Sequence, residues 1–175
     1  MFNDALVNFV PLGSNLPILA AAVPSNVYDA LGTGVGTAPQ VIIGNRTLFG
    51  TDLGIGGPKP QLQVNTNVAF ATAAGALLNI AFQGAPDSGV GGGYQPGAWT
   101  SILNQDGLTI AELAALSVVF RMDWPAALPA NLNPRYFRLL FTPTAAYTAG
   151  SIGSATVTMG RDDQANKYAT KNFTV

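Results

Sequence analysis

The sequence predicts an all-β protein, an antiparallel jelly-roll β-sandwich of about eight strands with extended N- and C-terminal segments. Three observations favour this class. Short runs alternate apolar and polar residues, the 20 Gly and 12 Pro are spread along the whole chain, and helical periodicity is nearly absent. About eight short strands separated by Gly and Pro turns are typical of a jelly roll. A chain of 175 residues suits one domain, which buries roughly 70% of its unfolded surface.

The most regular strand is Gln61–Phe70, QLQVNTNVAF. Side chains alternate between the two faces of a strand, so this run separates into two sets. One set is Leu62, Val64, Thr66, Val68 and Phe70, and the other is Gln61, Gln63, Asn65, Asn67 and Ala69. The second face carries neutral amides and no charge, although solvated sheet faces and edges commonly carry charged residues.

The other predicted strands share this short alternating pattern. In chain order the set is Asn26–Leu31, Gln40–Ile43, Gln61–Phe70, Ala76–Gln83, Ser117–Trp124, Arg135–Thr142, Ile152–Met159 and Asn172–Val175. Between them, Gly84–Gly97 is predicted as a long loop. Gly107–Leu116 is predicted as a short helical turn in which Thr109 and Glu112 form a capping box. Residues 1–24 are predicted as an N-terminal extended segment or arm, and residues 25–175 as a single jelly-roll domain.

Charge is scarce. Charged residues make up 10% of the chain, well below the usual ~25%. The 13 Asn and 7 Gln outnumber the 8 Lys and Arg together with the 9 Asp and Glu. The basic residues are scattered singly, which favours neither nucleic acid nor an anionic membrane as a partner. Two interpretations stay open. The chain is either a soluble protein with little selection on its surface charge, or a protein whose surface is largely covered in an assembly.

The residue inventory argues against catalysis. Without His or Cys, the chain lacks Ser-His-Asp and Cys-His arrangements and His-ligated metals. The glycine-rich stretches Gly32–Gly36 and Gly89–Tyr94 do not have phosphate-binding spacing. Asp162 and Asp163 with Asn166 are predicted as a solvated turn rather than a calcium loop. We therefore predict no enzyme activity, no catalytic residue, no cofactor and no metal.

Two further groups of side chains leave alternatives open. Arg135 and Arg138 enter an apolar strand, where one of them suits a paired or interface role, or else an exposed edge position. Trp99 and Tyr94 beside the long loop could form a platform for a sugar, or pack in the core or at an edge.

Several stretches together resemble a known family. They are FNDALV, SNVYDALGTG (Ser25–Gly34), RYFRLLF (Arg135–Phe141), YTAGSIGSATVTM (Tyr147–Met159) and RDDQANKYATKNFTV (Arg161–Val175). Their order is similar to that in capsid cement, or decoration, proteins of tailed bacteriophages, related to the one on the Bordetella podophage shell.

The resemblance implies a non-enzymatic jelly-roll β-sandwich on the outer surface of the virion capsid. Such a protein binds the major capsid protein, bridges its subunits, and associates with itself, with a homodimer favoured and a homotrimer possible. Neither nucleic acid nor a membrane is an expected partner. The alternative function is a carbohydrate- or receptor-binding β-sandwich module of a virion.

Two sets of residues are candidates for contact with a partner. The first is the apolar N-terminal segment, whose anchors would be Phe2, Phe9, Leu12, Leu16 and Ile18. The alternative is that this segment completes its own sandwich. The second set is Gln63 and Asn65 on the amide face, because an amide both donates and accepts hydrogen bonds and is easily satisfied in a contact. Here the alternative is a face that is simply solvated.

Overall fold

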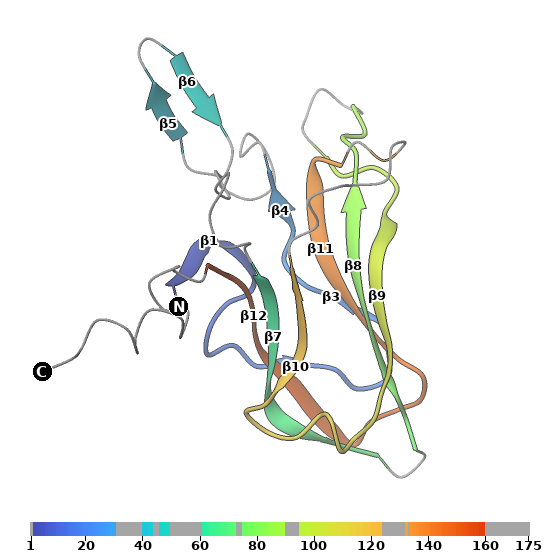
Figure 1. Ribbon diagram of the computed structural model, residues 1–175. Helices are drawn as coiled ribbons and strands as arrows, with labels where there is room; N and C mark the ends of the chain where they lie inside the picture. The colour runs from blue at the N-terminus through green and yellow to red at the C-terminus, as the bar shows by residue number, and fades with distance from the viewer. Residues whose placement is uncertain are drawn as a thin grey trace, which may run out of the picture.

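Two antiparallel sheets pack face to face, so the expected β-sandwich is confirmed (Figure 1). The computed structural model describes residues 2–30, 40–43, 46–49, 61–72, 75–89, 95–123, 132 and 134–159. All the regular structure in this part of the chain is strand. A helix long and apolar enough to cross a membrane is not found among these residues.

The first sheet, called the β7 sheet below, has the strand order β1-β12-β7-β10, with β2 also paired to β12. Its strands are β1 (Phe2–Val10), β2 (Leu16–Pro17), β7 (Gln61–Ala71), β10 (Val118–Asp123) and β12 (Ala149–Met159). The second, the β8 sheet, has the order β3-β11-β8-β9, with β4 paired to β11. Its strands are β3 (Val23–Pro24), β4 (Tyr28–Asp29), β8 (Leu78–Ala85), β9 (Thr100–Leu108) and β11 (Tyr136–Pro143). A separate hairpin joins β5 (Gln40–Ile43) to β6 (Arg46–Phe49).

Every predicted strand up to Met159 has a counterpart, and Gln40–Ile43 has the predicted bounds. The predicted strand Asn172–Val175 lies outside the described residues. The strands β1, β2, β3, β6 and β9 were not predicted. The reason is clearest for β9, an edge strand in which most side chains are exposed, so that it lacks the alternation by which a strand with one buried face is found.

The core lies between the two sheets. Its β7-sheet side includes Leu62 and Val64, and its β8-sheet side includes Ile80 and Phe82; all four are 0% exposed. The N-terminal segment also contributes to it. Phe9 meets the ring of Phe82 edge to face, with 6.1 Å between ring centroids. Burial of one such side chain contributes roughly 1.5–3 kcal/mol.

Strand β7 follows its predicted alternation from Leu62 to Thr66 and then departs from it. Val68 was expected on the inner face but is 44% exposed. The register between β7 and β12 shifts at three points between Asn65 and Ala71, and such bulges turn side chains away from their expected face. In this region Gly150 has φ 146°, and a Cβ built there would lie 2.4 Å from the Phe70 ring. Only glycine fits at that position.

The segment that was predicted as a short helical turn forms turns but no helix. Half of the predicted capping box is present, because the Thr109 N–H donates to the Glu112 carboxylate at 2.8 Å. The Thr109 hydroxyl donates to the same carboxylate at 2.8 Å. These bonds hold the pKa of Glu112 below its usual value. The turn directs Leu113, which is fully buried, into the core.

Candidate partner-binding surface

The outer face of the β7 sheet carries the amides that the sequence singled out. Leu62 and Val64 point into the core, so Gln63 and Asn65 point outward. Residues paired across neighbouring strands share a face, which places their partners outward as well. Gln63 lies opposite Thr156 on one side and Arg121 on the other, and Asn65 lies opposite Ser154 and Val118. We call these six residues together with Asn67, two positions along from Asn65, the amide face.

Side-chain hydrogen bonds link the amide face across three strands. Arg121 Nη2 on β10 donates to Gln63 Oε1 at 3.0 Å. Gln63 Nε2 donates to Asn65 Oδ1 at 2.9 Å, and Asn65 Nδ2 donates to Ser154 Oγ on β12 at 2.9 Å. Each amide therefore donates and accepts within a directed relay. The side chains are held in place before any partner arrives, which lowers the entropy lost on binding.

The amide face presents few charges. Gln63, Asn65 and Asn67 are half-buried, and Ser154 and Thr156 are 2% and 4% exposed. Arg121 is its one charged member. A surface of fixed, neutral groups that both donate and accept can meet another neutral protein surface without the cost of burying a charge.

The predicted N-terminal anchors separate into different environments. Phe9 and Ile18 are 1% and 0% exposed in the core, and Leu16 packs against the core from β2. In this arrangement they complete the protein's own sandwich. Phe2 lies in β1 opposite Met159, and its side chain is outside the described part. Leu12 is 72% exposed, so among the anchors whose side chains the structure describes it is the one available to a partner.

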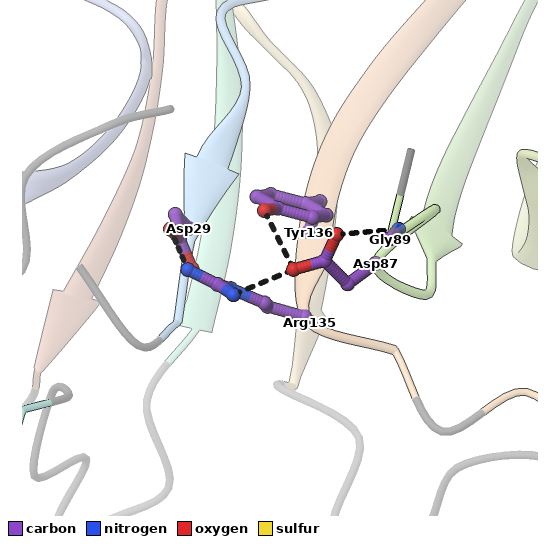
Figure 2. A network of polar contacts seen from close by, with 5 residues as sticks. All are labelled: Asp29, Asp87, Gly89, Arg135 and Tyr136. Carbon is purple, nitrogen blue, oxygen red and sulfur yellow. Dashed lines mark hydrogen bonds and ion pairs between the residues drawn. The ribbon is translucent and has the colours of Figure 1, made fainter. Parts of the chain in front are cut away.

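A second group of polar residues lies where β4 ends and β11 begins (Figure 2). Arg135 makes a two-pronged ion pair with Asp29, from Nε to Oδ1 and from Nη2 to Oδ2, each at 2.9 Å. Arg135 Nη1 also reaches Asp87 Oδ2 at 2.7 Å, in the loop after β8. Asp87 in turn accepts the Gly89 N–H at 3.1 Å. We call these four residues, with Tyr136, the Arg135 cluster.

The buried ion pair of the Arg135 cluster indicates a clamp between segments of the chain. Asp29 is 0% exposed and Arg135 is 9% exposed, so water solvates neither charge well and each is stabilised by its ion-pair partner. The bonds to Asp29 raise the pKa of Arg135. The Gly89 N–H lowers the pKa of Asp87, and burial raises that of Tyr136. Both carboxylates contact the Arg135 guanidinium, Asp29 through two hydrogen bonds and Asp87 through one. The cluster thus ties the loop after β8 to two strands of the β8 sheet, and Arg135 has the paired role that its sequence context suggested.

The other predicted features give weaker candidates. Arg138 lies over the Trp99 ring, 4.2 Å from its centroid, and its Nε donates to Gln83 Oε1 at 2.9 Å. One face of that ring is therefore occupied by Arg138 instead of being open to a sugar. Tyr94 and the Asp162–Asp163 turn lie outside the described residues. Within the described chain, no three His, Cys, Asp or Glu side chains gather in a way that could hold a metal ion.

No protein-family model matches this chain, and no curated protein matches it. The chain's own surface is therefore the guide to its partner. Of the groups described above, the amide face is the one that is accessible, preorganised and chemically able to contact another protein.

Proposed function

We propose that this chain is a structural virion protein that binds the outside of an icosahedral phage capsid and stabilises the shell by bridging major capsid protein subunits. The observation that carries the proposal is the amide face. Its hydrogen-bonded relay from Arg121 through Gln63 and Asn65 to Ser154 supports a role in contact with protein. The resemblance to phage cement proteins supplies the shell as the partner.

A surface with few charged residues suits a protein whose faces are buried in contacts with other proteins. An unpaired charge buried in a contact costs several kcal/mol, whereas a buried amide costs little once it is hydrogen-bonded. The low charge of the whole chain, 10% of its residues, fits the same requirement. A free protein of this kind is poorly protected against association, which is acceptable for a chain that spends its time in an assembly.

The finer fold assignment, a jelly roll, belongs to this proposal. We treat β3 and β4 as one interrupted strand, because both pair with β11. The two sheets then have the orders β1-β12-β7-β10 and β3/β4-β11-β8-β9. From β7 onward, successive long strands alternate between the two sheets, except that β8 and β9 are consecutive strands of the same sheet. This alternation supports two interlocked Greek keys, the arrangement of a jelly roll.

Stabilisation of the shell would arise from several modest contacts acting together. A dimer, the favoured oligomer, would present two amide faces and could hold two capsid subunits at once. Once one contact has formed, the second becomes intramolecular, and avidity exceeds the affinity of either contact. The shell would then resist expansion more strongly than any single contact would allow.

Adding the purified chain back to particles that lack it tests this function. We expect it to co-sediment with the particles and to raise the temperature at which they release their DNA. Bovine serum albumin at the same concentration controls for nonspecific protection. Particles that neither bind the chain nor gain heat resistance would exclude the cement role.

A further inference from the structure

Two exposed leucines stand beside one hollow on the amide face. Leu12 and Leu116 are 72% and 82% exposed. Both line a hollow of about 240 Å³, which is also lined by Asn65, Asn67 and Gly153. Single exposed leucines are ordinary, but two that line the same hollow form an apolar site beside the amides.

Leu12 is held outward by its turn. The Ser14 N–H donates to the Pro11 carbonyl at 3.0 Å, and Gly13 has φ 81°. This is the geometry of a type II turn, with glycine at the third position and Leu12 at the exposed second position. The turn thus presents Leu12 on a fixed backbone.

Leu116 is held outward at a conformational cost. Its φ is 54°, the left-handed region in which a residue with a branched side chain is strained by roughly 1–2 kcal/mol. Glycine or asparagine would adopt this backbone more easily. An apolar, strained and 82% exposed side chain adds little to folding, which indicates that it is kept for contact with something else.

The buried hydroxyl of Thr66 fixes the turn that carries Leu116. It donates to the Ala114 carbonyl and accepts the Ser117 N–H at 3.1 Å. The Thr66 N–H donates to the Ser117 carbonyl at 3.0 Å. The turn therefore remains attached to β7, and Leu116 remains beside the hollow.

The polar residues that line the hollow can hydrogen-bond to an incoming group. Gly153 has no side chain, and a Cβ there would come within 2.9 Å of Asn67 Cβ. The Asn67 amide makes no hydrogen bond to the rest of the described chain, and Asn65 Nδ2 uses one of its two hydrogens on Ser154. Donors and acceptors thus remain next to the two leucines.

We propose that this hollow binds an uncharged, extended segment of the major capsid protein. One apolar side chain of the segment lies between Leu12 and Leu116, and a backbone amide pairs with Asn65 and Asn67. A peptide group is neutral and both donates and accepts, which matches an amide side chain. At about 240 Å³ the hollow is smaller than the roughly 300–1,000 Å³ sites that enclose small molecules, so it suits one side chain. The inference rests on the proposed function.

The variants L116N and L116G test the proposal. Both remove the apolar side chain and suit the left-handed backbone, so we expect their thermal midpoints to stay within a few degrees of wild type. We expect affinity for particles lacking the chain to fall about 10-fold or more, the loss expected for one buried leucine. The matched control is L103N, an exposed leucine (44%) on β9 of the other sheet, which should bind like wild type.

Two measurements accompany the binding assay. Sedimentation velocity compares the mass of each variant with that of wild type. Overlapping peptides of the major capsid protein probe the hollow directly, and we expect wild type, but not L116N, to retain uncharged peptides. Unchanged particle binding by L116N would overturn the proposal, as would an altered mass, which would make a second copy the occupant. If wild type binds no particles, the proposed function fails, and the peptide result alone decides whether the hollow is a segment-binding site.

Discussion

Replacing Arg135 with methionine is expected to lower the free energy of unfolding by about 3–5 kcal/mol. Methionine keeps much of the side-chain length but leaves the Asp29 carboxylate, which is 0% exposed, without its two-pronged partner. It also releases Asp87 and with it the loop after β8. A loss of this size is a large fraction of the usual ~5–15 kcal/mol stability of a protein. Urea unfolding at neutral pH measures it.

Two further variants make the result specific to the Arg135 cluster. Arg121→Met removes an exposed arginine and should change stability by less than about 0.5 kcal/mol. The double change Arg135→Met with Asp29→Leu removes both buried charges and should recover much of the loss. If Arg135→Met unfolds no more easily than Arg121→Met, the Arg135 cluster does not act as a clamp.

Placing charge on the amide face is expected to weaken binding to the shell by about 100-fold or more. Gln63→Glu and Asn65→Asp replace each amide nitrogen with an oxygen, so the side chains keep their size, but the hydrogen bond from Gln63 to Asn65 is lost. The carboxylate introduced at position 63 keeps Arg121 as a partner. The carboxylate at position 65 no longer donates to Ser154 and has no cation beside it. A buried unpaired charge costs several kcal/mol, and each ~1.4 kcal/mol is tenfold in affinity. Titration of particles lacking the chain measures the change.

The matched control makes the same amide-to-carboxylate changes on another strand. Asn104→Asp and Gln105→Glu add two carboxylates to exposed positions of β9, in the other sheet. This control has the same net charge as the first variant and should bind within a few fold of wild type. Equal binding by both variants would mean that the amide face is solvated on the particle.

Alternation was sufficient to predict the strands with one buried face. Leu62, Val64 and Thr66 of β7 are inward as predicted, because a pleated strand places alternate residues on one side. Val68 departs from the pattern because register is set with the partner strand, and the shifts against β12 leave no mark in the sequence of β7. The edge strand β9 was missed for a related reason, since both of its faces are largely exposed.

The sites depend on contacts between distant residues. Arg135 and Asp29 are 106 positions apart, and Arg135 and Asp87 are 48 apart, so no local pattern predicts the Arg135 cluster. Sequence reasoning found Gln63 and Asn65 from their neutrality but not the relay to Arg121 and Ser154. It named Leu12 as an anchor together with Phe9 and Ile18, because hydrophobicity alone does not distinguish a core residue from an exposed one at a turn.

The number of copies of this chain in a virus particle tests the central claim most directly. If the chain is a cement protein, quantitative mass spectrometry on purified virus particles from its source would report the chain relative to the major capsid protein. A ratio comparable to that of the shell protein is the predicted result, and its value would indicate which symmetry positions are filled. A few copies per particle, as a tail or receptor-binding component would give, or none at all, would contradict the claim.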